Sequence, residues 1–591
     1  MPVRQGNGFM DKCFEEYQRW LTEPSLREDE KRELAAISNN EKEQTERFYT
    51  ELEFGTAGLR GILGLGTNRM NEYVVRRASA GLAAYLLQLD GAKDAGVAIA
   101  YDSRNRSDEF AKLAARTLAA YGIRVFLYST LHSVPQLSFT VRELGCIAGI
   151  VITASHNPPE YNGYKVYWSH GGQVGPEQAS EILESIRAFD YFDTELIDYE
   201  LAKKQGLIIP IGTEVDLVYY EKTLSLMLNP DIVKAENEKN ETNIVYTPLH
   251  GSGLVPVTAI LDIAGVKKVC VVPRQAWPDG DFPTVKAPNP EDPNAFKLAI
   301  DLAKQVDAPL ILATDPDADR LGVAVREKSG EYRLLTGNQI GSLLIYYILS
   351  ELKAQNKLPD DGFVVKSLVS TALADAICRS FGVEMRQVLT GFRFIANEID
   401  LAEKSGRGKF LFGFEESYGF LAGGFARDKD AILASLLVCE AATVYASRGK
   451  TLIDVLDSIY EEYGCFIEKT KSYTLTGKEG IERIEACMRS LRVSPPSDFG
   501  AGETVLRRED FTALECVDTQ SGKVSKIDLP ESNVLRYILP ADAWIVVRPS
   551  GTEPKLKLYI GASANSAADA EARLCRLETN ADKLISELLG V

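Results

Sequence analysis

The amino-acid sequence predicts an α/β protein in which three similar α/β domains precede a smaller C-terminal α+β domain. Apolar strand-like runs alternate with amphipathic helical stretches from about residue 55 to residue 381, the pattern of layered domains with mainly parallel sheets. The last part instead has three strand-like runs before one long helical stretch. A chain of 591 residues suggests roughly three to five domains. We expect the domains to span 1–205, 206–325, 326–460 and 461–591.

The elements follow from hydrophobic periodicity. Residues 10–50 carry many charges among scattered apolar positions and predict a polar, solvated helical arm. We expect strands at residues 96–101, 124–128, 148–153, 243–246, 268–272, 310–313, 363–366, 510–518, 534–539 and 544–548. We expect helices at residues 108–121, 256–264, 294–304, 339–352, 372–381 and 567–588.

Composition excludes several classes of protein. The chain is 45% hydrophobic and 25% charged, as in soluble globular proteins. Its nine cysteines form no C-x-x-C pair, which disfavours a zinc site or a disulfide framework and fits a reducing cytoplasm. No signal core and no apolar run of about 20 residues is present, and a net charge of −18 disfavours nucleic acid. We expect a cytoplasmic protein without nucleic-acid or membrane partners, monomeric or alternatively dimeric.

The first candidate site is the segment T-A-S-H-N-P at residues 153–158. It follows the apolar run 149–152, and α/β folds usually bind ligands at the carboxyl ends of strands. Ser155 is therefore a candidate nucleophile, with a plain strand-to-turn serine as the alternative. A hydrolase triad is disfavoured because there is no G-x-S-x-G elbow, and because an extended segment would point His156 elsewhere. Lys165, downstream, can act as a base or neutralise phosphate.

The second candidate site is D-P-D-A-D-R at residues 315–320, between two apolar runs. The carboxylates of Asp315, Asp317 and Asp319 would repel one another, and a divalent cation is the natural compensation. All-oxygen ligation favours Mg²⁺ over zinc. An EF-hand is excluded because Arg320 stands where that loop needs Gly and Arg326 where it needs Glu. An aspartyl-phosphate phosphatase and a solvated acidic turn stay open on this motif alone.

Two further loops follow strand-like runs. G-F-E-E-S-Y-G at residues 413–419 suits sugar hydroxyls, which bind carboxylates through charge-assisted hydrogen bonds. R-P-S-G-T-E-P-K at residues 548–555 can surround a phosphate dianion. Alone, each could be an ordinary polar or basic turn. The Gly-rich loop 54–61 and the segments T-G-F-R at 390–393 and R-D-K-D at 427–430 add cations.

These motifs occur in one order, one per expected domain, and together they resemble the α-D-phosphohexomutase superfamily. The similarity runs from about Glu53 to Gly561. The run T-A-S-H-N-P-P-E-Y-N-G-Y-K-V-Y at 153–167 is most similar to the long, bacterial-type phosphoglucomutase branch, which includes relatives acting on phosphopentoses. The resemblance implies a heart-shaped fold of four domains with mixed sheets and a central cleft.

The resemblance also implies individual roles. Ser155 would be the phosphorylated serine and would hold Mg²⁺ with Asp315, Asp317 and Asp319. The other catalytic positions around the transfer centre would be Arg60, His156, Lys165 and Arg320. The substrate would be bound by Thr390, Arg393, Glu415, Ser417, Lys429, Arg548, Ser550, Gly551, Thr552 and Lys555. The family has lysine where this chain has Arg393, a change that keeps the charge but alters its geometry.

The implied activity is that of a phosphoglucomutase. Phosphoserine 155 would give its phosphoryl group to a sugar monophosphate, glucose 1,6-bisphosphate would turn over in the cleft, and the serine would take back the other phosphoryl group. Lys165 and His156 are both candidate general bases, and we expect the last domain to open and close. Glu-Glu-Ser at 415–417 resembles the glucose-type loop more than the loops of mannose-type or glucosamine-type relatives. Phosphomannose and phosphopentose stay open as substrates, as does synthesis of glucose 1,6-bisphosphate. More remote hypotheses are a phosphatase using Asp315 and a non-catalytic sugar-phosphate sensor.

Overall fold

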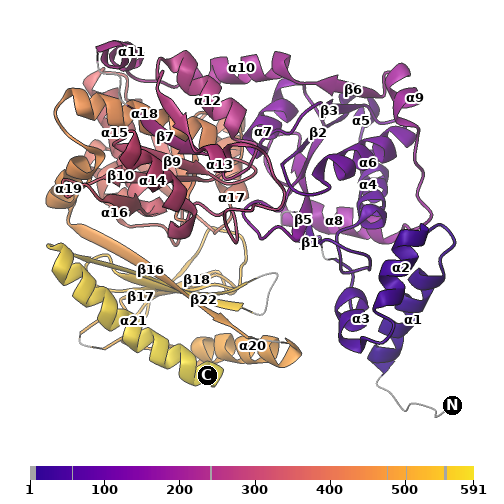
Figure 1. Cartoon of the computed structure of the whole chain (residues 1–591). Coiled ribbons are helices and arrows are strands. Elements are labelled where there is room, and N and C mark those ends of the chain that lie inside the picture. The colour runs from indigo at the N-terminus through magenta and orange to yellow at the C-terminus, as the bar shows by residue number, and fades with distance from the viewer. Residues whose placement is uncertain are drawn as a thin grey trace. The chain divides into compact units, whose positions relative to one another are not determined.

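The computed structural model describes residues 8–52, 54–55, 58–239, 243–475, 477–500, 502–550 and 555–591 (Figure 1). The chain forms two compact units. Unit 1 contains the residues up to Leu334 together with Gly423–Leu437, and unit 2 contains Leu335–Ala422 and Val438–Val591. Within these two units the strands form four sheets. The expected domain boundaries after residues 205, 325 and 460 stay predictions.

The first sheet of unit 1 is mixed, with the strand order β1-β5-β4-β2-β3-β6. Its strands are β1 Leu59–Ile62, β2 Val97–Tyr101, β3 Val125–Tyr128, β4 Ala148–Ile152, β5 Tyr161–Trp168 and β6 Ile208–Ile211. β2 runs parallel to β3 and β4, whereas β5 is antiparallel to β1 and β4. Because Tyr101 of β2 lies opposite Ile152 of β4, the loops after these two strands emerge at the same edge of the sheet.

Helices flank this sheet and link it to the next. They are α4 Glu72–Leu86, α5 Ala92–Ala95, α6 Ser107–Ala120, α7 Val134–Glu143, α8 Pro176–Arg187, α9 Tyr199–Lys204, α10 Thr213–Leu224 and α11 Pro230–Lys239. α6 packs on β2, β3 and α4, and α7 packs on β2 and β4. α7 begins at a capping box in which Ser133 and Gln136 satisfy each other's backbone N–H groups.

The second sheet of unit 1 has the order β11-β10-β9-β7-β8. Its strands are β7 Ile244–Thr247, β8 Val269–Val271, β9 Leu310–Thr314, β10 Leu321–Arg326 and β11 Tyr332–Leu335. Its helices are α12 Leu254–Ala264, α13 Pro273–Ala276, the 3₁₀ turn η1 Pro293–Phe296 and α14 Lys297–Gln305. β9 and β10 pair antiparallel, with Thr314 opposite Leu321, so the segment 315–320 is the connection of a buried hairpin.

Unit 2 begins with a four-stranded sheet of order β13-β12-β14-β15. Its strands are β12 Gly362–Ser367, β13 Glu384–Val388, β14 Lys409–Glu415 and β15 Gly419–Leu421, and the helices here are α15 Gly337–Ala354, α16 Leu373–Phe381, α17 Phe392–Ser405, α18 Ala431–Ser447 and α19 Leu452–Tyr463. α18 begins in unit 1 and ends in unit 2. Among the described residues no single helix is long and apolar enough to cross a membrane, and α18 with α19 meets that test only as a pair bent by 85°.

The C-terminal part of unit 2 is a seven-stranded antiparallel sheet of order β16-β22-β21-β20-β17-β18-β19. The elements are β16 Cys465–Thr474, α20 Gly477–Val493, β17 Arg507–Asp510, β18 Glu515–Asp518, β19 Val524–Lys526, β20 Leu535–Ile538, β21 Trp544–Pro549, β22 Lys555–Ala564 and α21 Ala567–Leu589. Three mixed sheets with their helices thus precede one antiparallel sheet, and the predicted fold class is confirmed. The heart shape and the central cleft stay predictions.

One expected strand, 510–518, is wrong. The structure has a hairpin there, with β17 ending at Asp510 and β18 beginning at Glu515. The Asp510 carboxylate accepts the Thr512 N–H at 3.0 Å and so stabilises a turn, and Leu514 takes a left-handed backbone with φ 56°. Phe511, next to the end of β17, is buried in a cluster with Trp544.

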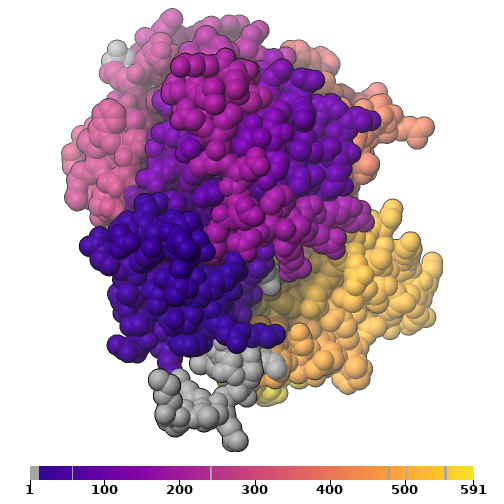
Figure 2. Space-filling model, turned by 90° about the vertical axis from the view of Figure 1, so that its right-hand side faces the viewer, coloured from indigo at the N-terminus to yellow at the C-terminus, as the bar shows by residue number. Residues whose placement is uncertain are grey.

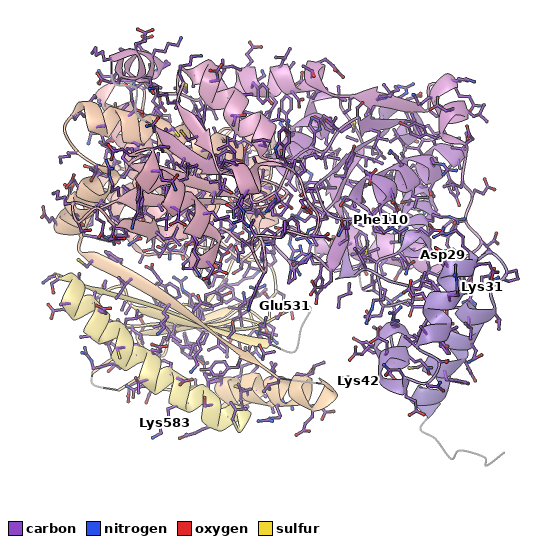
Figure 3. The ribbon with its side chains drawn as sticks, in the orientation of Figure 1. Asp29, Lys31, Lys42, Phe110, Glu531 and Lys583 are labelled. Carbon is purple, nitrogen blue, oxygen red and sulfur yellow. The ribbon has the colours of Figure 1, made fainter. Side chains whose placement is uncertain are left out.

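The N-terminal arm is helical, as predicted, and consists of α1 Gly8–Thr22, α2 Glu28–Ala36 and α3 Glu41–Phe48. The expectation that it is solvated is wrong. Tyr17, Trp20 and Leu34 are fully buried in the same hydrophobic core as the first sheet, and Figure 2 shows the indigo arm packed against that part of unit 1. Most charged residues of the arm are exposed instead, as Figure 3 shows for Lys42, which projects from the arm. These charged residues lie on the outer faces of the helices, and a stripe of apolar residues on the inner face packs into the core.

Candidate active site

The candidate nucleophile Ser155 lies just beyond β4, in the loop that joins it to β5. Its backbone adopts φ 54°, in the left-handed region that non-glycine residues seldom occupy. Its N–H donates to Thr153 Oγ1 at 2.8 Å, and 4% of the residue is exposed. Because this conformation breaks the extended run, His156 Nδ1 comes to 3.2 Å from Ser155 Oγ. We expected His156 to point elsewhere if the segment were extended, and the structure does not meet that condition.

Three carboxylates gather in the turn between β9 and β10. Ligand oxygens of Asp315, Asp317 and Asp319 lie within 4.8 Å of one another, and all three residues are buried. Ser155 Oγ donates to Asp315 Oδ2 at 2.8 Å, so the serine loop and the carboxylate loop meet inside unit 1. The other oxygen of Asp315 accepts the N–H of Arg320 at 3.0 Å and so holds the turn together. A solvated acidic turn is thereby excluded.

The donor set fits a hard divalent cation. Asp317 Oδ1 and Asp319 Oδ1 are buried without a hydrogen-bond partner among the described residues. Burying unsatisfied carboxylate oxygens is costly, and a cation that prefers oxygen ligands satisfies them. We therefore infer that Asp315, Asp317 and Asp319 can hold such an ion.

Burial and neighbouring charges set the protonation of these carboxylates. Burial raises the pKa of Asp315 and of Asp319, and the charge of Asp317 raises both further. Burial also acts to raise the pKa of Asp317, but the charges of Lys165 and Lys429, together with side-chain hydrogen bonds to Asp315 and Lys165, outweigh it, so the pKa of Asp317 is lowered. Ionising all three buried carboxylates is therefore unfavourable, and a bound cation would offset this cost by neutralising their charge.

Two lysines border the carboxylates. Lys165 of β5 donates to Asp317 Oδ2 at 2.8 Å. Lys429 Nζ lies 3.0 Å from Asp319 Oδ2 and 2.9 Å from Asp428 Oδ1. Lys429 belongs to Gly423–Leu437, the segment that joins unit 1 although its flanks belong to unit 2. The structure thus places Lys429, which we expected among the substrate ligands, beside the carboxylates.

Two arginines lie near His156. Arg60 on β1 donates to Asn157 Oδ1 at 3.2 Å, and Arg320 forms an ion pair with Glu291. Burial lowers the pKa of His156 well below 6.5, and the charges of Arg320 and Arg60 lower it further. The imidazole is therefore neutral at pH 7. Two residues of the Gly-rich loop before Arg60 lie outside the described residues, namely Thr56 and Ala57.

A loop that we did not predict from the sequence, residues 248–253, packs against the turn that carries the carboxylates. After β7 the chain runs P-L-H-G-S-G at 248–253, with left-handed backbones at Leu249 and His250. The N–H and the hydroxyl of Ser252 both donate to the carbonyl of Pro316 at 2.8 Å. A Cβ on Gly251 would lie 2.4 Å from Pro316 Cα, so only glycine fits there. The closely spaced glycines of this segment were the available signal.

In unit 2, the segment G-F-E-E-S-Y-G forms the turn between β14 and β15, and Ser417 lies in this turn. Glu415 Oε1 accepts the Gly391 N–H at 2.6 Å, which joins this turn to the start of α17. Glu416 Oε2 accepts from Ser367 Oγ at 2.9 Å. The hydroxyl of Thr390 is buried without a hydrogen-bond partner among the described residues. Carboxylates and hydroxyls, the groups that bind sugar hydroxyls well, thus lie close together around this turn.

The second loop of unit 2 connects β21 and β22. Arg548 lies in β21, and the Ser550 N–H donates to the Lys555 carbonyl at 2.7 Å. Burial lowers the pKa of Arg393, and the charge of Arg548 lowers it further. Two guanidinium groups therefore act on each other within one unit, an arrangement that favours a bound anion. Two expected members of this loop lie outside the described residues, namely Gly551 and Thr552.

Four domain models of one enzyme family match the chain in order. They are those of phosphoglucomutase/phosphomannomutase: α/β/α domain I at residues 51–191, domain II at 218–330, domain III at 336–463 and the C-terminal domain at 520–576. The chain belongs to the phosphoglucomutase/phosphomannomutase family. The resemblance inferred from the motifs is confirmed.

Individual members of the phosphoglucomutase/phosphomannomutase family agree with this assignment. A phosphoglucomutase of Staphylococcus epidermidis is 38% identical over 524 residues, covering 89% of this chain and 93% of its own. One from Staphylococcus aureus is 38% identical over 536 residues, covering 90% and 93%. Two solved structures share the fold. The phosphoglucomutase parafusin of Paramecium, in an open form, has a TM-score of 0.68 at 19% identity and covers 92% of this chain and 96% of its own. A family protein of Burkholderia thailandensis has a TM-score of 0.64 at 19% identity and covers 91% and 98%.

Proposed function

We propose that the protein is a phosphoglucomutase that interconverts α-D-glucose 1-phosphate and glucose 6-phosphate through phosphorylated Ser155 and glucose 1,6-bisphosphate. The observation that carries the proposal is the 2.8 Å hydrogen bond from Ser155 Oγ to Asp315, within a buried group of three carboxylates. A hydroxyl at a cation site can carry a phosphoryl group whose charge the cation neutralises. The curated relatives at 38% identity are named phosphoglucomutase.

The cofactor we propose is Mg²⁺, held by Asp315, Asp317, Asp319 and an oxygen on Ser155. When bound, it would supply charge stabilisation to the transferring phosphoryl group. Lys165 and Lys429 border the same carboxylates and supply positive charge near that group.

His156 is the general base that the geometry supports better. Its neutral imidazole lies 3.2 Å from Ser155 Oγ, whereas the Lys165 ammonium is engaged by Asp317. In the forward step a sugar hydroxyl attacks phosphorus, the bond from phosphorus to Ser155 Oγ breaks, and the proton of the attacking hydroxyl passes to His156. The protonated His156 then gives that proton to the departing Ser155 Oγ. In the second half Ser155 Oγ attacks the other phosphoryl group of the bisphosphate, its proton passes to His156, and the sugar oxygen that leaves phosphorus takes that proton.

Substrate binding falls to unit 2 in this proposal. Thr390, Glu415 and Ser417 would contact the sugar hydroxyls. Arg393, Arg548 and the loop Ser550–Lys555 would hold the phosphate that is not being transferred, because two neighbouring guanidinium groups favour a dianion. These groups must accept the bisphosphate in two orientations. We propose a cytoplasmic enzyme that acts as a monomer on a small phosphosugar.

The test is a coupled assay of the purified protein with Mg²⁺ and a trace of glucose 1,6-bisphosphate. We expect rapid conversion of glucose 1-phosphate to glucose 6-phosphate and a loss of at least about 1,000-fold in Ser155→Ala, because the variant lacks the group that carries the phosphoryl. Ser180→Ala, an exposed serine on α8, is the matched control and should keep full activity.

Ribose 1-phosphate and mannose 1-phosphate are offered in parallel. Faster turnover of either sugar phosphate would change the proposed substrate but leave the proposed mechanism unchanged. No isomerisation of any sugar, or full activity in Ser155→Ala, would contradict the proposed function.

A further inference from the structure

We propose that Arg104 is a positioning residue that holds the loop after Ser155 in the geometry required for phosphoryl transfer. The inference rests on the proposed function, because that function makes Ser155 the phosphoryl carrier. Arg104 lies in the loop between β2 and α6, outside every motif recognised in the sequence. Its side chain is fully buried, so it cannot be explained as a solvent-facing charge.

The guanidinium of Arg104 serves four backbone carbonyls of one loop. Nη1 donates to the carbonyls of Pro158 and Tyr161, each at 2.9 Å. Nη2 donates to the carbonyl of Ser155 at 2.6 Å and to that of Asn157. One rigid planar fork therefore binds the start, the middle and the end of the segment 155–161. The contact is possible because β2 and β4 are parallel neighbours whose following loops share an edge.

The serine loop needs this support. Ser155 has φ 54°, and such a backbone persists only where its surroundings determine it from several sides. Thr153 Oγ1 accepts the Ser155 N–H on one side. On the other side, the Ser155 carbonyl would lose its buried donor without Arg104, and a buried carbonyl left unpaired is costly. Arg104 thus opposes relaxation of Ser155 into an ordinary backbone conformation.

Arg104 is itself held in place. Asp102 Oδ2 lies 3.5 Å from Arg104 Nε, and Asp102 Oδ1 accepts the Arg104 N–H at 3.0 Å and the Ser107 hydroxyl at 2.8 Å. The ring of Phe282 covers the guanidinium, with its centroid 5.0 Å away. Burial lowers the pKa of Arg104 and the charge of Asp102 opposes that shift. The guanidinium keeps its charge, since an arginine is protonated far above neutral pH.

The first experiment compares wild type with Arg104→Lys. Lysine keeps the charge but has a single nitrogen and no fork, so it cannot serve four carbonyls. We expect kcat to fall by about 100-fold, because a displacement of about 1 Å in a reacting group has that effect, while KM stays within about twofold because the substrate ligands are untouched. Phosphorylation of Ser155 by glucose 1,6-bisphosphate, followed by intact mass, should slow in parallel.

The matched control is Arg116→Lys, because Arg116 also donates to a backbone carbonyl, that of Ile197, elsewhere in unit 1. It should keep wild-type kcat. If Arg104→Lys fails to fold, Asp102→Asn removes the charge that faces Arg104 and should lower kcat by about 10-fold with an intact thermal unfolding transition.

Wild-type kcat in Arg104→Lys, or a rise in KM alone, would overturn the positioning role. So would loss of folding in both variants, which would make the role purely structural. An inactive wild-type protein would instead sink the proposed function, so the two failures are distinguishable.

Discussion

Ser155 combines a left-handed backbone with a side chain directed at a buried carboxylate. A backbone of this kind costs about 1–3 kcal/mol and is usually stored at functional sites. Asp315, its acceptor, has a pKa raised well above 3.8 by burial and by the two neighbouring aspartates. The backbone strain at Ser155 and the repulsion among the carboxylates both destabilise the folded protein when no ligand is bound. A ligand that removes the carboxylate repulsion should therefore stabilise the folded protein.

At the residue scale we therefore predict that Mg²⁺ raises the thermal unfolding midpoint. A ligand at about 100 times its dissociation constant adds about 2.7 kcal/mol to the free energy of unfolding. Asp319→Asn should lose most of this shift, because it removes one of the three carboxylates. Differential scanning calorimetry with Mg²⁺ or with excess EDTA measures it, and excess EDTA should also abolish turnover.

Asp307→Asn is the control for this experiment, because Asp307 is an exposed carboxylate shortly before β9. It should respond to Mg²⁺ as wild type does. An equal shift in wild type and in Asp319→Asn would contradict the cation site.

The parts of the site that the sequence made predictable are those with local signatures. Ser155 and the three aspartates each follow an apolar strand, and their spacing alone suggested a nucleophile and a cation site. The orientation of His156 could be predicted only for an extended segment, because it depends on the φ angle of Ser155, which the sequence pattern does not reveal. Arg104 was missed because its partners are backbone carbonyls far along the chain, and backbone atoms leave no trace in side-chain patterns.

At the scale of elements, the loop 248–253 acts as a rigid support for the carboxylate turn. Ser252 binds the carbonyl of Pro316 twice. Gly251 approaches the backbone of Pro316 more closely than any side chain would allow. The position of Asp315 and Asp317 thus depends on a neighbouring loop that carries no catalytic group.

We predict that Gly251→Ala lowers both Mg²⁺ affinity and kcat by about 10- to 100-fold. The new methyl would meet Pro316 Cα at 2.4 Å, and a backbone atom between two metal ligands cannot move without moving them. Calorimetric Mg²⁺ titration and the coupled assay measure the two effects.

The control is Gly175→Ala. Gly175 has φ −71° and its Cβ would meet one side-chain atom at 3.9 Å, so alanine should be tolerated with wild-type values. Unchanged Mg²⁺ affinity in Gly251→Ala would show that the support loop does not position the carboxylates.

Elements were predicted well where apolar runs were long and bounded. The strands and helices expected in the first α/β unit agree with β2, β3, β4 and α6 to within a residue or two. The expected strand 510–518 was wrong because Asp510 forms a turn with its own side chain, a local competition that a run of strand-forming residues conceals.

At the scale of the whole molecule, the arm is part of a core and not an appendage. Trp20 packs edge-on against Phe48 and Tyr73, at ring distances of 6.0 and 5.6 Å, and also contacts Phe192 at 5.0 Å. The sequence did not reveal this, because helical periodicity shows which face is apolar but not what covers it.

We predict that Trp20→Ala destabilises unit 1 by about 3–5 kcal/mol, as expected for removal of a fully buried aromatic side chain. At low temperature kcat should stay near wild type, because the aromatic partners of Trp20, among them Phe48, Tyr73 and Phe192, are not site residues. Urea unfolding followed by fluorescence measures the change. Phe14→Ala, at a residue 52% exposed, should cost less than about 1 kcal/mol. If Trp20→Ala were as stable as Phe14→Ala, the arm would not contribute to the core of unit 1, and this prediction would be wrong.

The segment Gly423–Leu437 belongs to unit 1, although the residues before and after it in the chain belong to unit 2. It carries Lys429, which pairs with the carboxylate of Asp319. Domains usually fold in order as the ribosome releases them. Here the earlier unit stays incomplete until residue 437 has been synthesised, by which time the first segment of the later unit, Leu335–Ala422, already exists. The carboxylate cluster therefore acquires its last lysine late in translation, and a nascent chain interrupted before this segment would carry three buried aspartates without that charge.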